Sequence, residues 1–167
     1  MFRNKTIIFV FFVFFLIVLA VLLWPFREDL IDEEQEVLLY FSDQEAMYLE
    51  AETRRVAADN IFYNTLNELI SGPKRDSVFR TLPEEVEVKE ISVSENVAII
   101  NFSKNFIEQH VGGSTGERIT VYSIVNTMNQ FDEIDSVKFL VEGEEIETLG
   151  HMDLSQPVFP SQDLIQD

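Results

Sequence analysis

The chain has 167 residues, with 30 acidic and 12 basic side chains and a net charge of −18. This charge argues against nucleic acid as a partner, because binding to phosphates needs a basic surface. The sequence contains no cysteine, which excludes disulfides, thiolate metal sites, cysteine nucleophiles and a lipid-bearing cysteine.

The first 27 residues predict a membrane anchor. No charged side chain occurs from Thr6 to Phe26, and about 20 apolar residues in a helix can cross a bilayer. Arg3 and Lys5 precede this stretch and an acidic run follows it. We therefore expect residues 1–27 to form a cytoplasmic stub and a single-pass transmembrane helix, with the rest of the chain outside the cell membrane. A cleaved signal peptide is the alternative, but the stretch is long for one and lacks a small-residue cleavage site.

The chain beyond this anchor predicts one small domain. Residues 28–35 are typical of an acidic linker, 36–158 would form the domain, and 159–167 would be a flexible tail. Ten basic and 30 acidic residues follow Lys5, which gives this outer part a net charge of −20. We expect such a charge to favour solubility and to oppose self-association.

The domain opens with a predicted β-hairpin. The run Val37–Phe41 is apolar on both faces, as in a buried strand. Residues 47–56 suit either a strand or a helix, and we favour a second strand. Its charged side chains alternate as on a solvent-exposed strand face, at Glu50, Glu52 and Arg54.

An amphipathic helix is predicted next. Asp59 is suited to cap its N-terminus. Gly72 in the left-handed conformation, followed by Pro73, would end it. The apolar stripe of this helix consists of Phe62, Leu66, Leu69 and Ile70.

A second hairpin follows the loop after this helix. Val88 and Ile91 lie at opposite strand parity, so we expect a β-bulge near Lys89-Glu90. The segment 96–102 is apolar on both faces and predicts a central strand.

A second helix and a last strand complete the domain. Ser114 and Glu117 have the spacing of a capping box, and residues 137–142 predict the strand. The glycine-rich loop 112–116 could present amides to an anion, but no lysine follows it, so we favour a flexible, capped loop. The stripe of this helix consists of Val121, Ile124, Val125 and Met128.

The resulting order, β-β-α-β-β-α-β, indicates an α+β fold in which two helices cover one face of a mixed sheet. The sequence contains none of the common catalytic motifs. His110 and His151 are accompanied by neither a serine elbow nor metal-ligand spacing. Acidic pairs are so frequent that they carry no signal. We therefore predict no enzyme, no cofactor and no metal.

Five ordered landmarks resemble one known family. They are VLLYFSD at 37–43, LEAETRRV at 49–56, LNELISGP at 66–73, and the longer blocks at 81–106 and 124–143. Together they resemble the GerMN domain of the sporulation and spore germination protein GerM family. The resemblance implies an exported, membrane-tethered, non-enzymatic domain akin to the ring-building motif. It assigns structural positions to Tyr40, Phe41, Glu52, Arg54, Leu69, Gly72, Pro73, Phe102, Ser103, Thr127, Phe131 and Gly143.

The residues and the resemblance together predict a binding or assembly module of the bacterial cell envelope, acting in sporulation or germination. Its partners would be the membrane, as an integral protein with its N-terminus inside, and other envelope proteins or further copies assembled there. A cell-wall or small-ligand binding module is the alternative and predicts a pocket of converging polar and aromatic groups; an acidic hydrolase is a weaker one. The candidate interaction residues are Lys74, Arg75, Arg80, Glu142, Glu144, Glu145 and Glu147.

Overall fold

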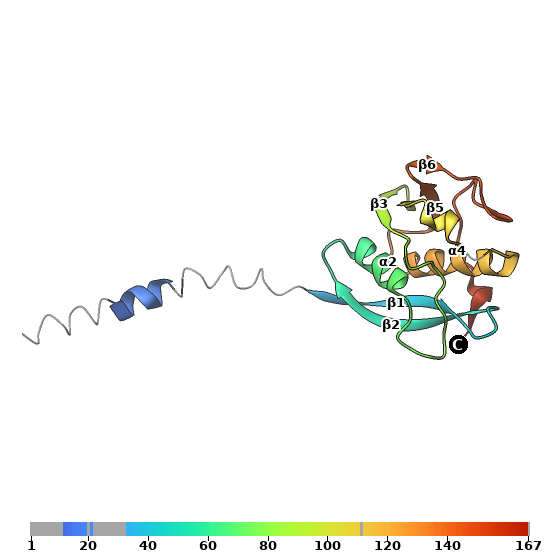
Figure 1. Ribbon diagram of the computed structural model, residues 1–167. Helices are drawn as coiled ribbons and strands as arrows, with labels where there is room; N and C mark the ends of the chain where they lie inside the picture. Colours follow the sequence, from blue (N-terminus) through green and yellow to red (C-terminus); the bar gives the residue numbers. More distant parts are fainter. Residues whose placement is uncertain (1–11, 20, 22–32, 111, 167) are drawn as a thin grey trace, which may run out of the picture. The chain divides into compact units, whose positions relative to one another are not determined.

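The computed structural model describes residues 12–19, 21, 33–110 and 112–166. The chain divides into two compact units, Met1–Glu33 and Glu34–Asp167. In the first unit, residues 12–19 are helical (Figure 1). The elements of the second unit carry the functional argument.

The structure contradicts the predicted transmembrane helix. Among the described residues, none of the helices combines the length and apolar character that crossing a bilayer requires. Of the predicted cytoplasmic stub and anchor (1–27), residues 1–11, 20 and 22–27 lie outside the described residues, as does most of the linker (28–32). The fold class that we predicted is therefore wrong in its N-terminal part.

The second unit begins with the predicted hairpin. Strands β1 (Glu34–Ser42) and β2 (Leu49–Ala57) pair antiparallel along their whole length. The strand interpretation of residues 47–56 is thus confirmed. The expected solvent exposure of Glu52 and Arg54 is wrong, since both side chains are buried on the inner face of β2.

Helix α2 (Ile61–Ser71) has the predicted apolar stripe, and Leu66, Leu69 and Ile70 are buried. Asn60, rather than Asp59, occupies its N-cap position. At its C-terminus Gly72 has φ 91° and ψ 176°. The predicted positive φ is confirmed, but the conformation is extended rather than left-handed helical.

The second hairpin consists of β3 (Val88–Ser94) and β4 (Val97–Phe102). The predicted bulge is confirmed by a register shift between Val88 and Glu90. After the short helix α3 (Asn105–Glu108), helix α4 (Ser114–Met128) leads into β5 (Ser136–Val141), which pairs parallel with β4. The edge strand β6 (Glu144–Glu145) pairs with β5.

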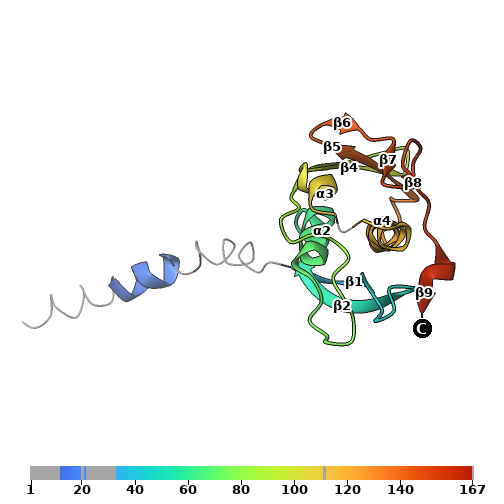
Figure 2. The same cartoon turned by 45° about the vertical axis from the view of Figure 1, so that its right-hand side comes forward.

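The strands form separate sheets rather than the single mixed sheet that we predicted. The larger sheets have the orders β1-β2-β9 and β3-β4-β5-β6. Helices α2 and α4 contact strands of both, and Figure 2 shows them between the two sheets. The α+β class is correct, but the helices form a middle layer instead of covering one face.

The C-terminal segment carries elements that the sequence did not predict. They are β7 (Thr148–Leu149), β8 (Met152–Asp153), the 3₁₀ helix η2 (Gln162–Leu164) and β9 (Ile165–Gln166). Residues predicted to form a tail thus have defined positions: Leu164 is buried, and Ile165 pairs with Leu49 of β2.

The core lies between the sheets and around the two helices. Phe102 stacks on Phe106 with ring centroids 4.6 Å apart, and Phe139 lies 6.3 Å from Phe102. Such a cluster of fully buried aromatic rings provides a large share of the apolar area removed from water. A smaller cluster of Leu49, Ile119 and Leu164 attaches the C-terminal segment to α4 and β2.

Candidate functional site

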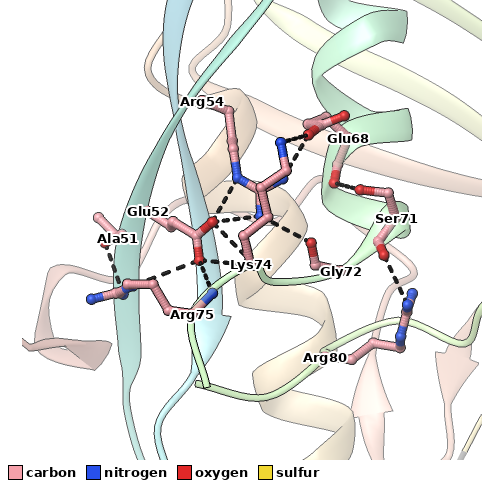
Figure 3. Close-up of polar contacts among 9 residues, drawn as sticks. All are labelled: Ala51, Glu52, Arg54, Glu68, Ser71, Gly72, Lys74, Arg75 and Arg80. Carbon is pink, nitrogen blue, oxygen red and sulfur yellow. Dashed lines mark hydrogen bonds and ion pairs between the residues drawn. The ribbon is translucent and has the colours of Figure 1, made fainter. Parts of the chain in front are cut away.

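Arg54 is the centre of a buried ion network on the inner face of β2 (Figure 3). Its Nε donates to Glu52 Oε1 at 2.6 Å, and its Nη1 lies 2.6 Å from Glu68 Oε1 on α2. Its Nη2 donates to the carbonyl oxygen of Gly72 at 3.1 Å. The guanidinium also lies over the ring of Phe41, with Cζ 5.9 Å from the centroid, close enough for a cation–π contact.

Glu52 attaches the loop after α2 to the same network. Its carboxylate accepts the backbone N–H groups of Lys74 at 3.2 Å and Arg75 at 3.3 Å. Burial alone would raise the pKa of Glu52, but the hydrogen bonds from Arg54 and from these two amides outweigh it and lower the pKa. Because its oxygens are already engaged, this carboxylate braces the fold and is poorly placed to act as an acid or base.

Gly72 and Arg80 close the C-terminal end of α2. The Arg80 guanidinium donates to the carbonyl oxygens of Ile70 and, at 2.8 Å, Ser71. A Cβ atom on Gly72 would lie 2.7 Å from Arg80 Nη2. Arg80 therefore satisfies carbonyls that a helix end leaves without partners, and only glycine leaves room for it.

A pocket of about 490 Å³ opens at the hairpin end of the unit. We call it the Phe79 pocket, because the Phe79 side chain on its wall is 54% exposed. Its size falls within the range of small-ligand pockets, about 300–1,000 Å³. The lining residues are Ser42, Asp43, Gln44 and Ala46 after β1, the segment Phe79–Pro83, then Gln109, His110 and Gly112, and Gly116, Ile119 and Thr120 of α4.

His110 is fixed in this pocket by a hydrogen-bonded chain. Thr120 Oγ1 donates to the carbonyl oxygen of Thr81 at 2.7 Å. Its single proton is thereby used, so at 3.0 Å it accepts the proton on His110 Nε2. Burial lowers the pKa of His110, although the nearby Glu117 carboxylate opposes this shift. Burial thus favours the neutral ring, and the bond to Thr120 favours the tautomer with its proton on Nε2.

Glu117 holds the glycine-rich loop, in place of the full capping box that we predicted. Ser114 is the first residue of α4, whose N-cap is Gly113, with no side-chain cap. The buried Glu117 carboxylate accepts the N–H of Gly113 at 3.3 Å and the N–H of His151 at 2.8 Å. These bonds, the His151 amide first, lower the pKa of Glu117 against the effect of burial. The amide of Gly113 is therefore already occupied and is not available to an anion.

The predicted basic face lies on the loop after α2, and much of its charge is paired. Lys74 is 72% exposed and lies 3.2 Å from Glu68. Arg75 lies 3.5 Å from Glu50, and Arg80 lies 3.0 Å from Glu84. Lys74 therefore offers the most accessible positive charge of this face.

The predicted acidic face surrounds β6. Glu142 pairs with Lys89 and Glu145 with Lys138. The ion pair with Lys89 is the main reason why the pKa of Glu142 is lowered. Glu144 and Glu147 are exposed and form no ion pair with the described part of the chain. The loop after α2 and β6 lie on opposite sides of the unit in both views (Figure 1, Figure 2).

The remaining family-motif positions are distributed through the fold, and none of them lines the Phe79 pocket. Leu69 and Phe102 are fully buried, and Phe131 meets the ring of Phe62 edge-on at 4.9 Å. Pro73 is half-buried beside Gly72. Gly143, with φ 85°, donates its N–H to Asn101 Oδ1.

Two polar motif positions, Ser103 and Thr127, satisfy backbone groups. Ser103 Oγ accepts the N–H of Glu87 at 3.0 Å. Thr127 Oγ1 accepts the N–H of Tyr40 at 3.2 Å. Ser103, directly after β4, and Thr127, in α4, thus accept backbone N–H groups that strand pairing does not satisfy.

Sequence reasoning missed Phe79, Gln109 and the pairing of Glu68 with Arg54. The available signal for Phe79 was an aromatic residue in a loop that is mostly polar. Within residues 12–19, 21, 33–110 and 112–166, no group of three His, Asp or Glu side chains could hold a metal ion.

Comparisons with known proteins identify relatives of this fold. The family model Germane, described as sporulation and spore germination, matches residues 38–147. The tandem GerMN domains of the Bacillus subtilis sporulation protein GerM share 24% identity and a TM-score of 0.66, covering 76% of this chain and 46% of that one. This chain thus spans about half of the tandem protein. No protein with a curated description matches the sequence.

Two further solved structures are similar. The first GerMN domain of Bacillus subtilis GerM has a TM-score of 0.63 at 23% identity, covering 77% of this chain and 98% of that one. A candidate lipoprotein from Clostridium perfringens has a TM-score of 0.57 at 26% identity, covering 77% of this chain and 89% of that one. The GerM structures, below 25% identity, show the fold alone.

Proposed function

Because this chain belongs to the Germane family of sporulation and spore germination proteins, we propose that its folded unit is a non-enzymatic module that assembles with other proteins of the bacterial cell envelope. The family is not a known enzyme family. An envelope location is supported by the similarity to the Clostridium perfringens candidate lipoprotein. The buried carboxylates Glu52 and Glu117 favour the non-enzymatic role, since both are engaged in structural hydrogen bonds.

The acidic edge at β6 carries the assembly proposal. β6 is the edge strand of its sheet, and Glu144 and Glu147 there present exposed carboxylates that form no ion pair within the described part of the chain. Charged side chains on an edge strand oppose unspecific strand addition. They would instead attract a partner with a basic contact face, since complementary charge governs encounter and orientation.

Crosslinking and recovery of the full-length protein from sporulating cells tests this proposal. The double variant Glu144→Lys/Glu147→Lys should recover less of the partner proteins that the unchanged chain recovers. The matched control is Asp132→Lys/Glu133→Lys, which makes the same charge change in exposed residues before β5. Equal recovery with both variants would contradict the proposed contact face, and absence of any specific partner would contradict the assembly function.

A further inference from the structure

We propose that the Phe79 pocket binds a neutral oligosaccharide. This proposal does not depend on the assembly function, because the pocket is formed by the β1–β2 turn, the segment Phe79–Pro83 and the start of α4, and not by β6. Its ligand class follows from three properties of the pocket: an exposed aromatic wall, charges with internal partners, and neutral polar side chains.

The aromatic wall is the first property. Phe79 remains 54% exposed, whereas Leu82 and Ile119, which also line the pocket, are buried. The flat face of an aromatic ring beside an apolar floor suits a ligand that is itself flat and carries C–H groups on one side. A sugar ring has such a face, and its hydroxyl groups point outward from the ring edge.

The charged side chains of the pocket are already engaged. Asp43 Oδ1 accepts the N–H groups of Met47 at 2.7 Å and Tyr48 at 3.0 Å. Arg80 donates to the carbonyl oxygens at the end of α2 and pairs with Glu84. A charged ligand would have to displace one of these partners, and an anion would also be repelled by the acidic chain.

Some neutral polar groups of the pocket can still bind a ligand. Gln44 and Gln109 are exposed, and their side-chain amides form no hydrogen bond with the part of the chain that the structure describes. His110 uses Nε2 for Thr120, which leaves Nδ1 as an acceptor in the neutral ring. The amides and the neutral imidazole together offer both hydrogen-bond donors and acceptors, which match the hydroxyl groups of a sugar.

An extended peptide is a poorer occupant, because the strand edge beside the pocket is closed. Ser42 and Phe79 exchange two backbone hydrogen bonds, at 3.1 Å and 2.8 Å. Further along β1, Gln130 binds both backbone groups of Leu38. Peptides commonly bind by adding a strand to a free edge, and this edge is unavailable.

Solution NMR of the full-length chain, in a detergent without a sugar headgroup, tests the proposal. The probes are N,N′-diacetylchitobiose and cellotriose, which distinguish an N-acetylated wall-type glycan from a plain glucan. At millimolar concentration we expect at least one of them to shift the amide signals of Gln44, Phe79 and Gln109. No shift with either sugar would overturn the proposal.

Two variants connect the shifts to the pocket. Phe79→Ala should weaken binding by about tenfold, the upper size of an aromatic contact, while Phe79→Tyr, which keeps the ring, should retain it. Phe159→Ala is the matched control, because Phe159 is 64% exposed and lies outside the pocket. Shifts that persist in Phe79→Ala, or that vanish equally in Phe159→Ala, would overturn the assignment.

Discussion

Glu52 and Arg54 lie two residues apart on the inner face of β2 and hydrogen-bond to each other there at 2.6 Å, although both are nearly inaccessible to water. Their partners come from other elements: Glu68 from α2, and the backbone of the loop that begins at Gly72. Removal of two charges from water is costly and is tolerated only with dense pairing. The network therefore fixes where the loop after α2 leaves the helix.

Arg54→Ala should destabilise the folded unit by about 3–5 kcal/mol, the usual cost of breaking a buried ion pair, because Glu52 would stay buried without its arginine partner. The control is the neighbouring Arg55→Ala. Arg55 pairs with Glu36, and both side chains are more than 60% exposed, so that loss should be about 0–1 kcal/mol. Urea unfolding measures both. Similar losses for the two variants would mean that the network contributes little.

Acid should weaken the same network. The pKa of Glu52 is below its ordinary value of 4.5, so its contribution to stability is complete above that pH and is lost as pH falls through the folded-state pKa. The difference in unfolding free energy between the unchanged chain and Glu52→Gln should therefore shrink below about pH 4.5. A difference that stays constant on acidification, measured by unfolding at a series of pH values, would contradict this.

Gly72→Ala should cost about 1–3 kcal/mol, because its φ of 91° and ψ of 176° fall in a region that is essentially restricted to glycine. The new Cβ would also collide with the Arg80 guanidinium. Gly112→Ala is the control, since nothing lies within 4 Å of a Cβ there, and its effect should stay within about 0.5 kcal/mol. Calorimetric melting of both variants tests this prediction. An unchanged melting temperature for Gly72→Ala would show that alanine is not strained at this position.

Leu69→Ala should destabilise the unit by about 2–5 kcal/mol, as truncation of a fully buried leucine does. Leu69 is completely inaccessible on α2, whereas Ile107 on α3 is 44% exposed. Ile107→Ala should therefore cost clearly less in the same urea titration. If both variants lower the unfolding free energy by less than about 0.5 kcal/mol, the usual size at surface sites, the result would contradict the packing of α2 between the sheets.

Local patterns predicted individual elements well. The apolar stripe around Leu66 predicted α2, and the parity change between Val88 and Ile91 predicted the bulge, because both depend on neighbours in sequence. The alternation that includes Glu52 and Arg54 correctly predicted a strand. It placed these two side chains on the solvent-exposed face, whereas they lie on the buried face. Their burial depends on Glu68, which approaches only when α2 packs on β2, and no local pattern contains that information.

Local patterns could not predict which strands belong to which sheet, and they could not predict the Phe79 pocket. β9 has two residues, Ile165 and Gln166, too few for any periodicity. Strand alternation also does not reveal which strands pair, so two sheets were predicted as one. The Phe79 pocket joins residues from three distant segments, and neither Phe79 nor Gln109 belongs to a recognisable motif.

The folded unit should be monomeric in solution at low salt. Residues 34–167 contain nine basic and 26 acidic side chains, a net charge of −17, so two copies repel each other. Salt weakens this repulsion as the Debye length falls from about 30 Å at 0.01 M to about 8 Å at 0.15 M.

Light scattering of residues 34–167 in about 0.01 M salt should therefore give the mass of a single copy. If contact between copies exists, it should appear first at higher salt and involve Lys74 of one copy and the β6 edge of another. Lys74→Glu should then abolish the contact, and Glu144→Lys in the other copy should restore it. A stable oligomer at low salt would contradict the repulsion argument directly.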